Sequence, residues 1–343
     1  MNPTRLLALV MACTGCGSAI LRAADVLDAK SRDEITKAVE RGVPVLEKAA
    51  RSYPTHRQCF ACHHQTLPLL GLGEARKAGI TTDEKLPAEI VEFTCGSFRS
   101  KLDDLNAGEK IGGKGLTVGY AAWTLKLGAT IPDELTDAMT AFLLKTQEDD
   151  GHWGLHAIRP PAEESLVVCT VVAAAGLKVY ARNDRVLPAT TAIDKARNWL
   201  ATAKIESQED RMARLWGCRL LGTNDEDLAA ARQAVISAQR DDGGWGQTSE
   251  MPSDPYATGT TLYVLLDTGL ATGHPSVNRA VAYLVKAQKD DGSWLVETRA
   301  KPVQVFFDNG DPHGKSQFIS IAATGWSVAA LARSLQPSAS RGR

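Results

Sequence analysis

The sequence has no long run of like charges. Its 39 basic and 40 acidic residues leave a formal net charge of −1, and the two signs are mixed along the chain. Because proteins that bind nucleic acid concentrate positive charge on one face, this balance argues against nucleic acid as a partner. Beyond the N-terminus, no segment is apolar over the ~20 residues that a transmembrane helix needs. Strand patterns are also scarce, and the best short candidate, Val303 to Phe307, lies in a loop.

Cysteine is sparse as well. Beyond the N-terminal segment the sequence holds Cys59, Cys62, Cys95, Cys169 and Cys218. So few cysteines in a chain of this length exclude a small fold stapled by disulfides. Cys169 and Cys218 stand in apolar helical contexts, so we expect them to be small buried side chains.

The first 24 residues have the pattern of a secretory signal. Arg5 supplies a positive charge, Leu6 to Ala12 is apolar, and small residues follow. Cys13 and Cys16 also suggest lipoprotein processing, in which a cysteine becomes the lipidated terminus. We therefore expect residues 1–24 to be a signal peptide and the protein to be exported, to the periplasm or the cell envelope. Membrane association is expected only through such a lipid anchor.

Three segments repeat one pattern. Each has an apolar helical period that runs into Gln-x₃-Gly-x-Trp. The pattern predicts a helix that Gly ends by taking positive φ, a Gln amide that bonds loop backbone, and a Trp ring that fills the gap beside the next helix. Such recurrence indicates a repeat architecture. The residues concerned are Gln147, Gly151 and Trp153, then Gln239, Gly243 and Trp245, then Gln288, Gly292 and Trp294.

Weaker copies complete a set of six helix pairs. In each pair an amphipathic outer helix is followed by an inner helix rich in small and apolar residues. The expected outer and inner segments are 33–53 with 63–79, 87–102 with 113–129, 138–154 with 163–180, 191–204 with 210–224, 231–246 with 254–270, and 277–295 with 315–334. Six such pairs predict an all-α fold, an (α/α)6 toroid over residues 25–335 with a disordered tail over 336–343. An open superhelix of the same pairs is the structural rival.

The Gln-x₃-Gly-x-Trp repeat resembles the QW motif of squalene–hopene cyclases and related terpenoid cyclases. The resemblance covers essentially the whole mature chain and implies the toroid that these enzymes share with protein prenyltransferase β subunits. It does not carry over the chemistry. Cyclases of this kind protonate their substrate with an Asp-x-Asp-Asp motif, which this sequence lacks, and it also lacks Asp-Asp-x-x-Asp. Of the prenyltransferase zinc ligands, Asp254 matches the Asp, but Tyr256 stands where the Cys would be.

Polar residues recur at the starts of the inner helices. In a toroid all inner helices run in one direction, so these starts meet at one mouth of the ring. We therefore expect Asp254, Tyr256, Glu164 and His313 to line that mouth and to serve as catalytic groups if the protein is an enzyme. The competing interpretation is that acidic residues at helix starts are caps.

Cys59-x-x-Cys62-His63 fits the attachment motif of c-type haem, in which two thiols bind the vinyl groups and the histidine binds iron. Zinc bound through His63 and His64 with the cysteines, a local disulfide, or plain packing are the alternatives. Three functions follow from the sequence: an exported toroid that binds an apolar or small ligand in its central cavity, a haem-bearing redox protein, or a non-catalytic binding scaffold. Whether the protein is an enzyme stays open at this point.

Overall fold

The computed structural model describes residues 29–302 and 305–336, and over these residues it contains helices and no strand. The signal predicted over 1–24, with Cys13 and Cys16, lies outside the described residues. So does most of the predicted tail, although Gln336 is described and donates to Glu74. Val303 is likewise outside, and the rest of the expected strand, 305–307, forms a loop. None of the described helices is long and apolar enough to cross a membrane.

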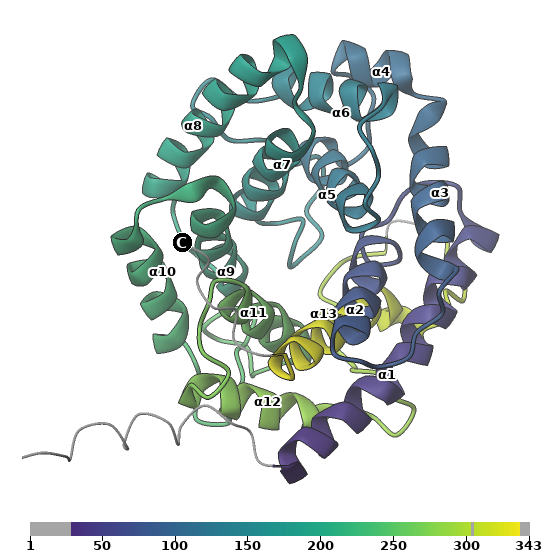
Figure 1. Ribbon diagram of the computed structural model, residues 1–343, viewed down its shortest axis with the longest axis vertical. Coiled ribbons are helices and arrows are strands. Elements are labelled where there is room, and N and C mark those ends of the chain that lie inside the picture. Colours follow the sequence, from purple (N-terminus) through teal and green to yellow (C-terminus); the bar gives the residue numbers. More distant parts are fainter. Residues whose placement is uncertain (1–28, 303–304, 337–343) are drawn as a thin grey trace, which may run out of the picture.

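The helices form two concentric layers (Figure 1). The outer layer contains α1 (Ala29–His56), α3 (Leu86–Arg99), α6 (Glu134–Lys145), α8 (Val186–Thr202), α10 (Asp225–Ser237) and α12 (Pro275–Ala287). The inner layer contains α2 (Thr66–Lys77), α5 (Lys114–Leu127), α7 (Leu166–Tyr180), α9 (Gln208–Gly217), α11 (Pro255–Asp267) and α13 (Gln317–Ser334). Short elements are α4 (Leu102–Ala107), η1 (Asn183–Arg185), the π turn η2 (Cys218–Gly222) and η3 (Gly314–Ser316).

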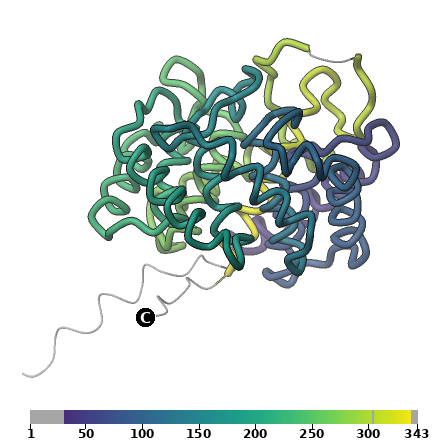
Figure 2. The backbone as a smooth tube through the Cα atoms, turned by 90° about the horizontal axis from the view of Figure 1, so that it is seen from above, coloured from purple at the N-terminus to yellow at the C-terminus, as the bar shows by residue number. Residues whose placement is uncertain are grey.

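The inner helices close into a ring, because α13 packs on α2 as well as on α11. Outer and inner helices alternate along the chain, so the protein is an α/α toroid and not an open spiral. The prediction of six outer–inner pairs is confirmed. Figure 2 shows the ring from the side, with the segment between α12 and α13 standing out on one face. That face holds the N-terminal ends of the inner helices.

Three glutamines each tie one outer helix to the next. In every Gln-x₃-Gly-x-Trp turn, Gln Nε2 donates to the Gly carbonyl of its own turn, at 2.8 to 2.9 Å. The same Nε2 also donates to a backbone carbonyl of the following outer helix. The acceptor is Ala192 for Gln147, Ser276 for Gln239 and Ala38 for Gln288, at 2.8 Å each. Because Ala38 belongs to α1, Gln288 joins the last repeat to the first helix. The ring is therefore closed by the same bond that joins α6 to α8 and α10 to α12.

The tryptophans of these turns join the outer layer to the inner one through hydrogen bonds. Each indole Nε1 donates to the carbonyl ten residues earlier, and each backbone N–H donates to a threonine hydroxyl of the inner helix of the same pair. All three indoles are at most 1% exposed. The pairs are Trp153 with Leu143 and Thr170, Trp245 with Val235 and Thr258, and Trp294 with Leu284 and Thr324.

Glycine is required in the last of these turns. Gly292 has a φ of +87°, in the left-handed region that favours glycine. A Cβ added there would lie 2.1 Å from the carbonyl oxygen of Arg41, on α1. The turn can therefore approach the first helix closely enough for Gln288 to reach Ala38.

Indole rings meet at the axis of the ring. Trp123, Trp216 and Trp326 come from α5, α9 and α13, which are every second helix of the inner layer, so their side chains touch across the axis. Their ring centroids are 4.8 to 6.3 Å apart. We expected small and apolar residues to line the centre. The small residues instead lie between neighbouring helices, as Gly119 does against the α7 backbone.

A buried ion pair closes the opposite end of the inner ring. Glu74 on α2 is 2% exposed, and its carboxylate faces the guanidinium of Arg333 on α13 at 3.4 Å. Arg333 also donates to Asp267 on α11 at 2.9 Å. A charge this deeply buried requires a partner, so this bridge helps to fix the three helices on which it stands.

Candidate functional site

A buried carboxylic acid lies at the mouth of the inner ring. Glu209, in the first turn of α9, is 4% exposed. The hydroxyl of Tyr256, in the first turn of α11, donates to Glu209 Oε1 at 3.0 Å. Burial raises the pKa of Glu209 to about 8, while the hydrogen bond from Tyr256 opposes that rise. The group is thus mostly protonated at neutral pH, as a general acid must be.

Three other carboxylates surround Glu209. The charges of Asp210, Asp254 and Glu164 add to the increase in its pKa. Each has a structural role of its own. Asp210 accepts from the Ser165 hydroxyl at 2.6 Å, and Asp254 caps α11 by accepting from the backbone of Ala257 at 2.9 Å.

Asp254 and Glu164 each make a contact that gives them a structural role at the mouth. Burial raises the pKa of Asp254 to about 6, and one carboxylate oxygen, Oδ1, makes the helix cap. Glu164 forms an ion pair with Arg299 at 2.6 Å, in which both side chains are 27% exposed. Asp254 is therefore a helix cap, as the competing interpretation predicted. Glu164 is not, because Ser165 caps α7. Both carboxylates still lie within electrostatic reach of Glu209.

Tyr120 connects the mouth to the aromatic centre. Its ring centroid is 5.9 Å from that of Trp123. Its pKa is raised far above the usual value, first by burial and then by the charges of Cys62 and Glu209. The pKa of Tyr256 is raised in the same way, with Glu209 and Cys62 again contributing. Residues of four different helix pairs therefore share one site, as expected for inner helices that start at one rim.

His313 stands apart from this group. Its Nε2 lies 2.7 Å from the hydroxyl of Ser293, and that hydroxyl is 2.6 Å from Asp291 Oδ1. Burial lowers the pKa of His313, and Asp291 partly offsets this. These contacts belong to the third Gln-x₃-Gly-x-Trp turn. Of the four predicted catalytic residues, the structure thus groups Tyr256, Asp254 and Glu164 around Glu209 and gives His313 different partners.

Glu209 was missed in the sequence, although a signal was present. We expected the fourth inner helix to begin at Asp210, and assigned no residue of that pair to the mouth. Ser207 and Asp210 form a capping box, in which Ser207 accepts from the Asp210 backbone and Asp210 accepts from the Ser207 backbone. A Ser-x-x-Asp pattern marks the N-terminus of a helix. Reading it would have placed Glu209 in the first turn.

The Cys-x-x-Cys-His segment lies in the loop between α1 and α2. Cys59 is exposed, Cys62 is half-buried, and both are free thiols. Cys62 Sγ is 3.9 Å from His63 Nδ1, and Cys59 Sγ is 3.4 Å from the hydroxyl of Tyr53. Burial raises the pKa of Cys62 to about 12 and lowers that of His63 to about 3. At neutral pH the pair is therefore a thiol beside an uncharged imidazole.

His64 is buried in an aromatic cluster beneath this loop. It is fully buried, and its ring stacks on Tyr53 with centroids 4.5 Å apart. Phe318 on α13 contacts both His63 and His64, with centroids 5.2 and 6.0 Å away. Neither ring nitrogen of His64 has a hydrogen-bond partner, and burial holds its pKa well below the usual value. Among the residues that the structure describes, no three His, Cys, Asp or Glu side chains gather to hold a metal ion.

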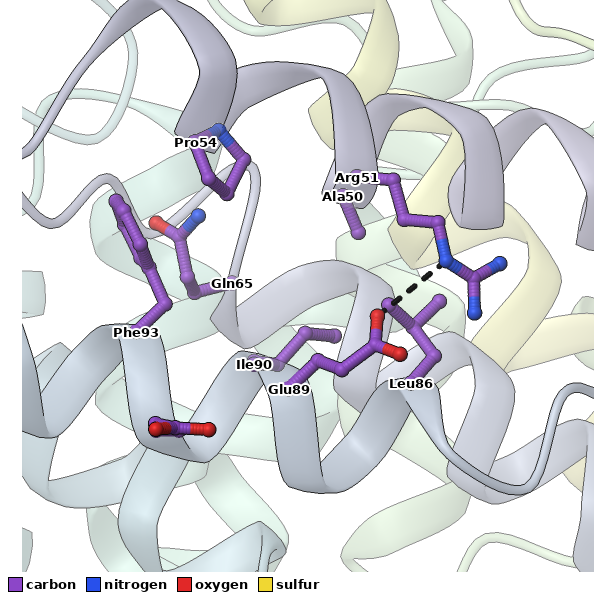
Figure 3. A pocket seen from close by; sticks show the side chains of 9 residues that line it. Ala50, Arg51, Pro54, Gln65, Leu86, Glu89, Ile90 and Phe93 are labelled. Carbon is purple, nitrogen blue, oxygen red and sulfur yellow. Dashed lines mark hydrogen bonds and ion pairs between the residues drawn. The ribbon is translucent and has the colours of Figure 1, made fainter.

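A hollow of about 360 Å³ lies outside the ring, between α1 and α3 (Figure 3). Pro54, Leu86, Ile90 and Phe93 give it an apolar wall, and Gln65 reaches it from the loop before α2. Arg51 and Glu89 form an ion pair across it at 3.3 Å. This hollow is separate from the mouth of the inner ring.

Comparison with known proteins supports the fold. No protein-family model and no curated protein matches the chain in sequence. Solved structures do resemble it in fold. A type II terpene cyclase, MstE from Scytonema, in complex with its product merosterolic acid A, has a TM-score of 0.59 at 14% identity, over 90% of this chain and 99% of that one.

Two other similar structures are described as carbohydrate-active proteins. A possible member of the GH105 family from Salmonella enterica serovar Paratyphi A has a TM-score of 0.57 at 14% identity, over 95% of this chain and 99% of that one. A glycosidase in complex with glucose has a TM-score of 0.56 at 13% identity, over 90% and 99%. The structural similarity supports the α/α toroid. Because the identities are this low, function has to be argued from the site itself.

Proposed function

We propose that the protein binds an apolar or small organic ligand at the mouth of its inner ring, and that Glu209 donates a proton to that ligand. The observation that carries this proposal is a carboxylic acid that is 4% exposed, has a pKa of about 8 and accepts a hydrogen bond from Tyr256. A buried acid that stays protonated near neutral pH is costly to maintain and is found mainly where proton transfer is needed.

The surroundings of Glu209 support the class of ligand. Tyr120 and Tyr256 stand beside it, and the indole cluster of Trp123, Trp216 and Trp326 lies next to Tyr120. Aromatic faces bind apolar ligands and stabilise positive charge, which develops when an alkene is protonated. Of the structures that resemble the chain, one was solved with the terpene cyclase product merosterolic acid A and one with glucose, and the QW-like repeats favour a terpenoid ligand.

The proposal departs from the squalene–hopene cyclases in its acid. Their Asp-x-Asp-Asp motif is absent, and the proton would come from Glu209 on the fourth inner helix. Tyr256 would hold the carboxyl in place. Asp254 and Glu164 would raise its pKa from nearby, and neither would need to touch the ligand. With the signal peptide that the sequence predicts, the proposal is an exported toroid protein that acts on, or stores, a small apolar molecule.

Deuterium transfer tests the proposal whatever the identity of the product. The purified protein is incubated in D₂O with squalene or geranylgeraniol, and the recovered probe is examined by mass spectrometry. Deuterium should enter the carbon skeleton with the wild-type protein. Glu209→Gln should bind the probe and transfer no deuterium, whereas Glu226→Gln, at an exposed position on α10, should behave as wild type.

Lipid extraction of the exported protein provides the complementary measurement. A molecule that repeatedly co-purifies identifies the natural ligand. Binding without deuterium transfer would favour the non-catalytic scaffold. Repeated preparations with no bound molecule, together with no deuterium in either probe, would refute both parts of the proposal.

A further inference from the structure

The loop between α1 and α2 presents two thiols and an imidazole at the face of the ring that carries the mouth. Cys59 is exposed, Cys62 and His63 are half-buried, and both thiols are free. Neither thiol is part of a disulfide in the described chain. The two thiols are thus available on one turn, three residues apart, with the histidine directly after the second.

The polar contact of His63 leaves one nitrogen for another partner. Its Nδ1 lies 3.9 Å from Cys62 Sγ. The ring is held by aromatic neighbours, with its centroid 5.2 Å from Phe318 and 6.4 Å from Tyr53. A histidine that is oriented through Nδ1 and by packing presents Nε2 in a fixed direction, which is how metal-binding histidines are usually oriented.

Buried polar atoms beside this loop lack partners. Both ring nitrogens of His64 are buried without a hydrogen bond, which is costly for a polar side chain that is fully buried. Such an orphaned group often marks a bound species or an ordered water.

Exposed apolar side chains lie beside the loop. Val305 and Phe306 are 84% and 62% exposed, and the guanidinium of Arg57 donates to the Val305 carbonyl at 3.4 Å. Apolar surface beside an arginine matches a flat apolar group that carries carboxylates at its edge.

We propose that Cys59 and Cys62 bind a haem covalently at this loop and that His63 Nε2 is an axial ligand of its iron. Each thiol S–H adds across one vinyl C=C of the haem. A C–S bond forms to one vinyl carbon, the thiol hydrogen goes to the other, and no oxidant is consumed. Arg57 would pair with a propionate. Haem supplies four iron ligands itself, so it needs only one from the loop, whereas the described residues bring no three ligands together for a bare ion.

The test uses the full chain, with its N-terminal segment, in a bacterium that carries the cytochrome c maturation system. A known c-type cytochrome is produced in the same cells to confirm that the system works. Intact mass spectrometry of the denatured protein should show the mass of one haem added. The reduced pyridine adduct should absorb at the shorter wavelength that two saturated vinyl groups give.

Variants separate the proposal from simpler explanations. Cys59→Ala and Cys62→Ala should each leave one thioether and shift the spectrum of the pyridine adduct, and the double variant should lose the haem on denaturation. Cys218→Ala removes a half-buried thiol outside the loop and should keep the full signal. His63→Ala should retain the covalent haem and change its axial ligation, which the visible spectrum of the native protein reports.

Two results would overturn the proposal. One is a mature chain of unmodified mass from cells in which the control cytochrome matures. The other is a chain two hydrogens lighter, or one that carries zinc and no porphyrin, which would assign the loop to a disulfide or a zinc site. These readouts do not depend on Glu209, so the haem site and the proposed proton transfer can fail separately.

Discussion

The hydroxyl of Tyr256 and the carboxyl of Glu209 meet at 3.0 Å, although 47 residues separate them in the chain. One residue begins α11 and the other begins α9, and the ring brings these two starts to the same rim. The hydrogen bond stabilises the charged form of Glu209, and burial destabilises that form more strongly. The protonation of this acid is thus set by two opposing effects that mutation can separate.

Glu209→Gln should flatten the dependence of stability on pH. The folded-state pKa of about 8 lies above the usual glutamate value of 4.5, so folding favours the protonated acid. Its contribution is complete below about pH 4.5 and is lost as pH rises through about 8. The wild-type protein should therefore lose up to about 4 kcal/mol of unfolding free energy across this window, relative to Glu209→Gln. Urea unfolding at pH 5, 6, 7 and 8 measures the difference. Glu226→Gln is the control, and an equal slope in Glu209→Gln and wild type would show that Glu209 ionises normally.

Tyr256→Phe should cost about 1 kcal/mol at pH 6, because a buried acid loses its hydrogen-bond donor. It should also extend the pH-dependent loss of stability to higher pH, since the loss still begins near pH 4.5 but the hydrogen bond no longer lowers the folded-state pKa of Glu209. Tyr180→Phe is the matched control. The Tyr180 hydroxyl is buried without a partner, so its removal should leave stability unchanged or improve it. Equal losses in the two variants would mean that the Tyr256 hydroxyl contributes only packing.

Gln288→Ala should destabilise the protein by about 2 kcal/mol, because the carbonyls of Gly292 and Ala38 both lose their donor. Gln233→Ala, on the exposed surface of α10, removes a bond to Ser237 within one helix and should cost less than about 0.5 kcal/mol. Thermal unfolding of the two variants decides the comparison. A small effect at Gln288 would show that ring closure rests on packing alone.

Gly292→Ala should be strongly destabilising, by more than about 2 kcal/mol, because the new Cβ would meet the Arg41 carbonyl and φ is +87°. Gly96→Ala tests the same change in the middle of α3, where nothing lies within 4 Å of the added atom. There alanine should stabilise the helix by about 0.5–1 kcal/mol. Urea unfolding measures both, and a tolerated Gly292→Ala would show that the turn can move away from α1.

Arg333→Met should cost about 1–3 kcal/mol, because the buried carboxylate of Glu74 loses one of its charged partners while Gln336 still donates to it at 3.0 Å. Lys77 also contacts Glu74, at 2.8 Å, but its side chain is 61% exposed. Lys77→Met should therefore change the free energy of unfolding by less than about 1 kcal/mol. If the two variants behave alike in thermal unfolding, Glu74 is solvated well enough to do without either cation.

Much of the fold could be derived from the sequence, because its signals are local and repeated. Each Gln-x₃-Gly-x-Trp copy carries the glycine of the turn that follows an outer helix and the groups that join that helix to the next one; the helix itself ends before the glycine, at Lys145, Ser237 or Ala287. Six successive outer–inner helix pairs leave few ways to pack other than a ring or a spiral. The bond from Gln288 to Ala38 decides for the ring, and it joins residues 250 positions apart. That separation is beyond the reach of a sequence pattern.

The site was harder to derive, because burial depends on the whole ring. Asp254 and Tyr256 could be placed at the mouth from their position at a helix start. Glu209 could not be recognised as a buried acid, because its burial comes from Tyr256 and other residues of neighbouring pairs. The meeting of Trp123, Trp216 and Trp326 was missed for a related reason. It depends on how three separate helices are rotated about their own axes. The many small residues on these helices leave no clear amphipathic pattern from which that rotation could be predicted.

The bond between Gln288 and Ala38 makes the joint between the last and first sections equivalent to those between α6 and α8 and between α10 and α12. Arg32 at the start of α1 also donates to the carbonyl of Leu335 just after α13, at 3.0 Å, so the two ends of the described chain are neighbours. A protein built in this way has no obligatory first section. Connecting those ends by a short linker and opening the chain before α8, near Asn183, should yield a circular permutant with the same architecture.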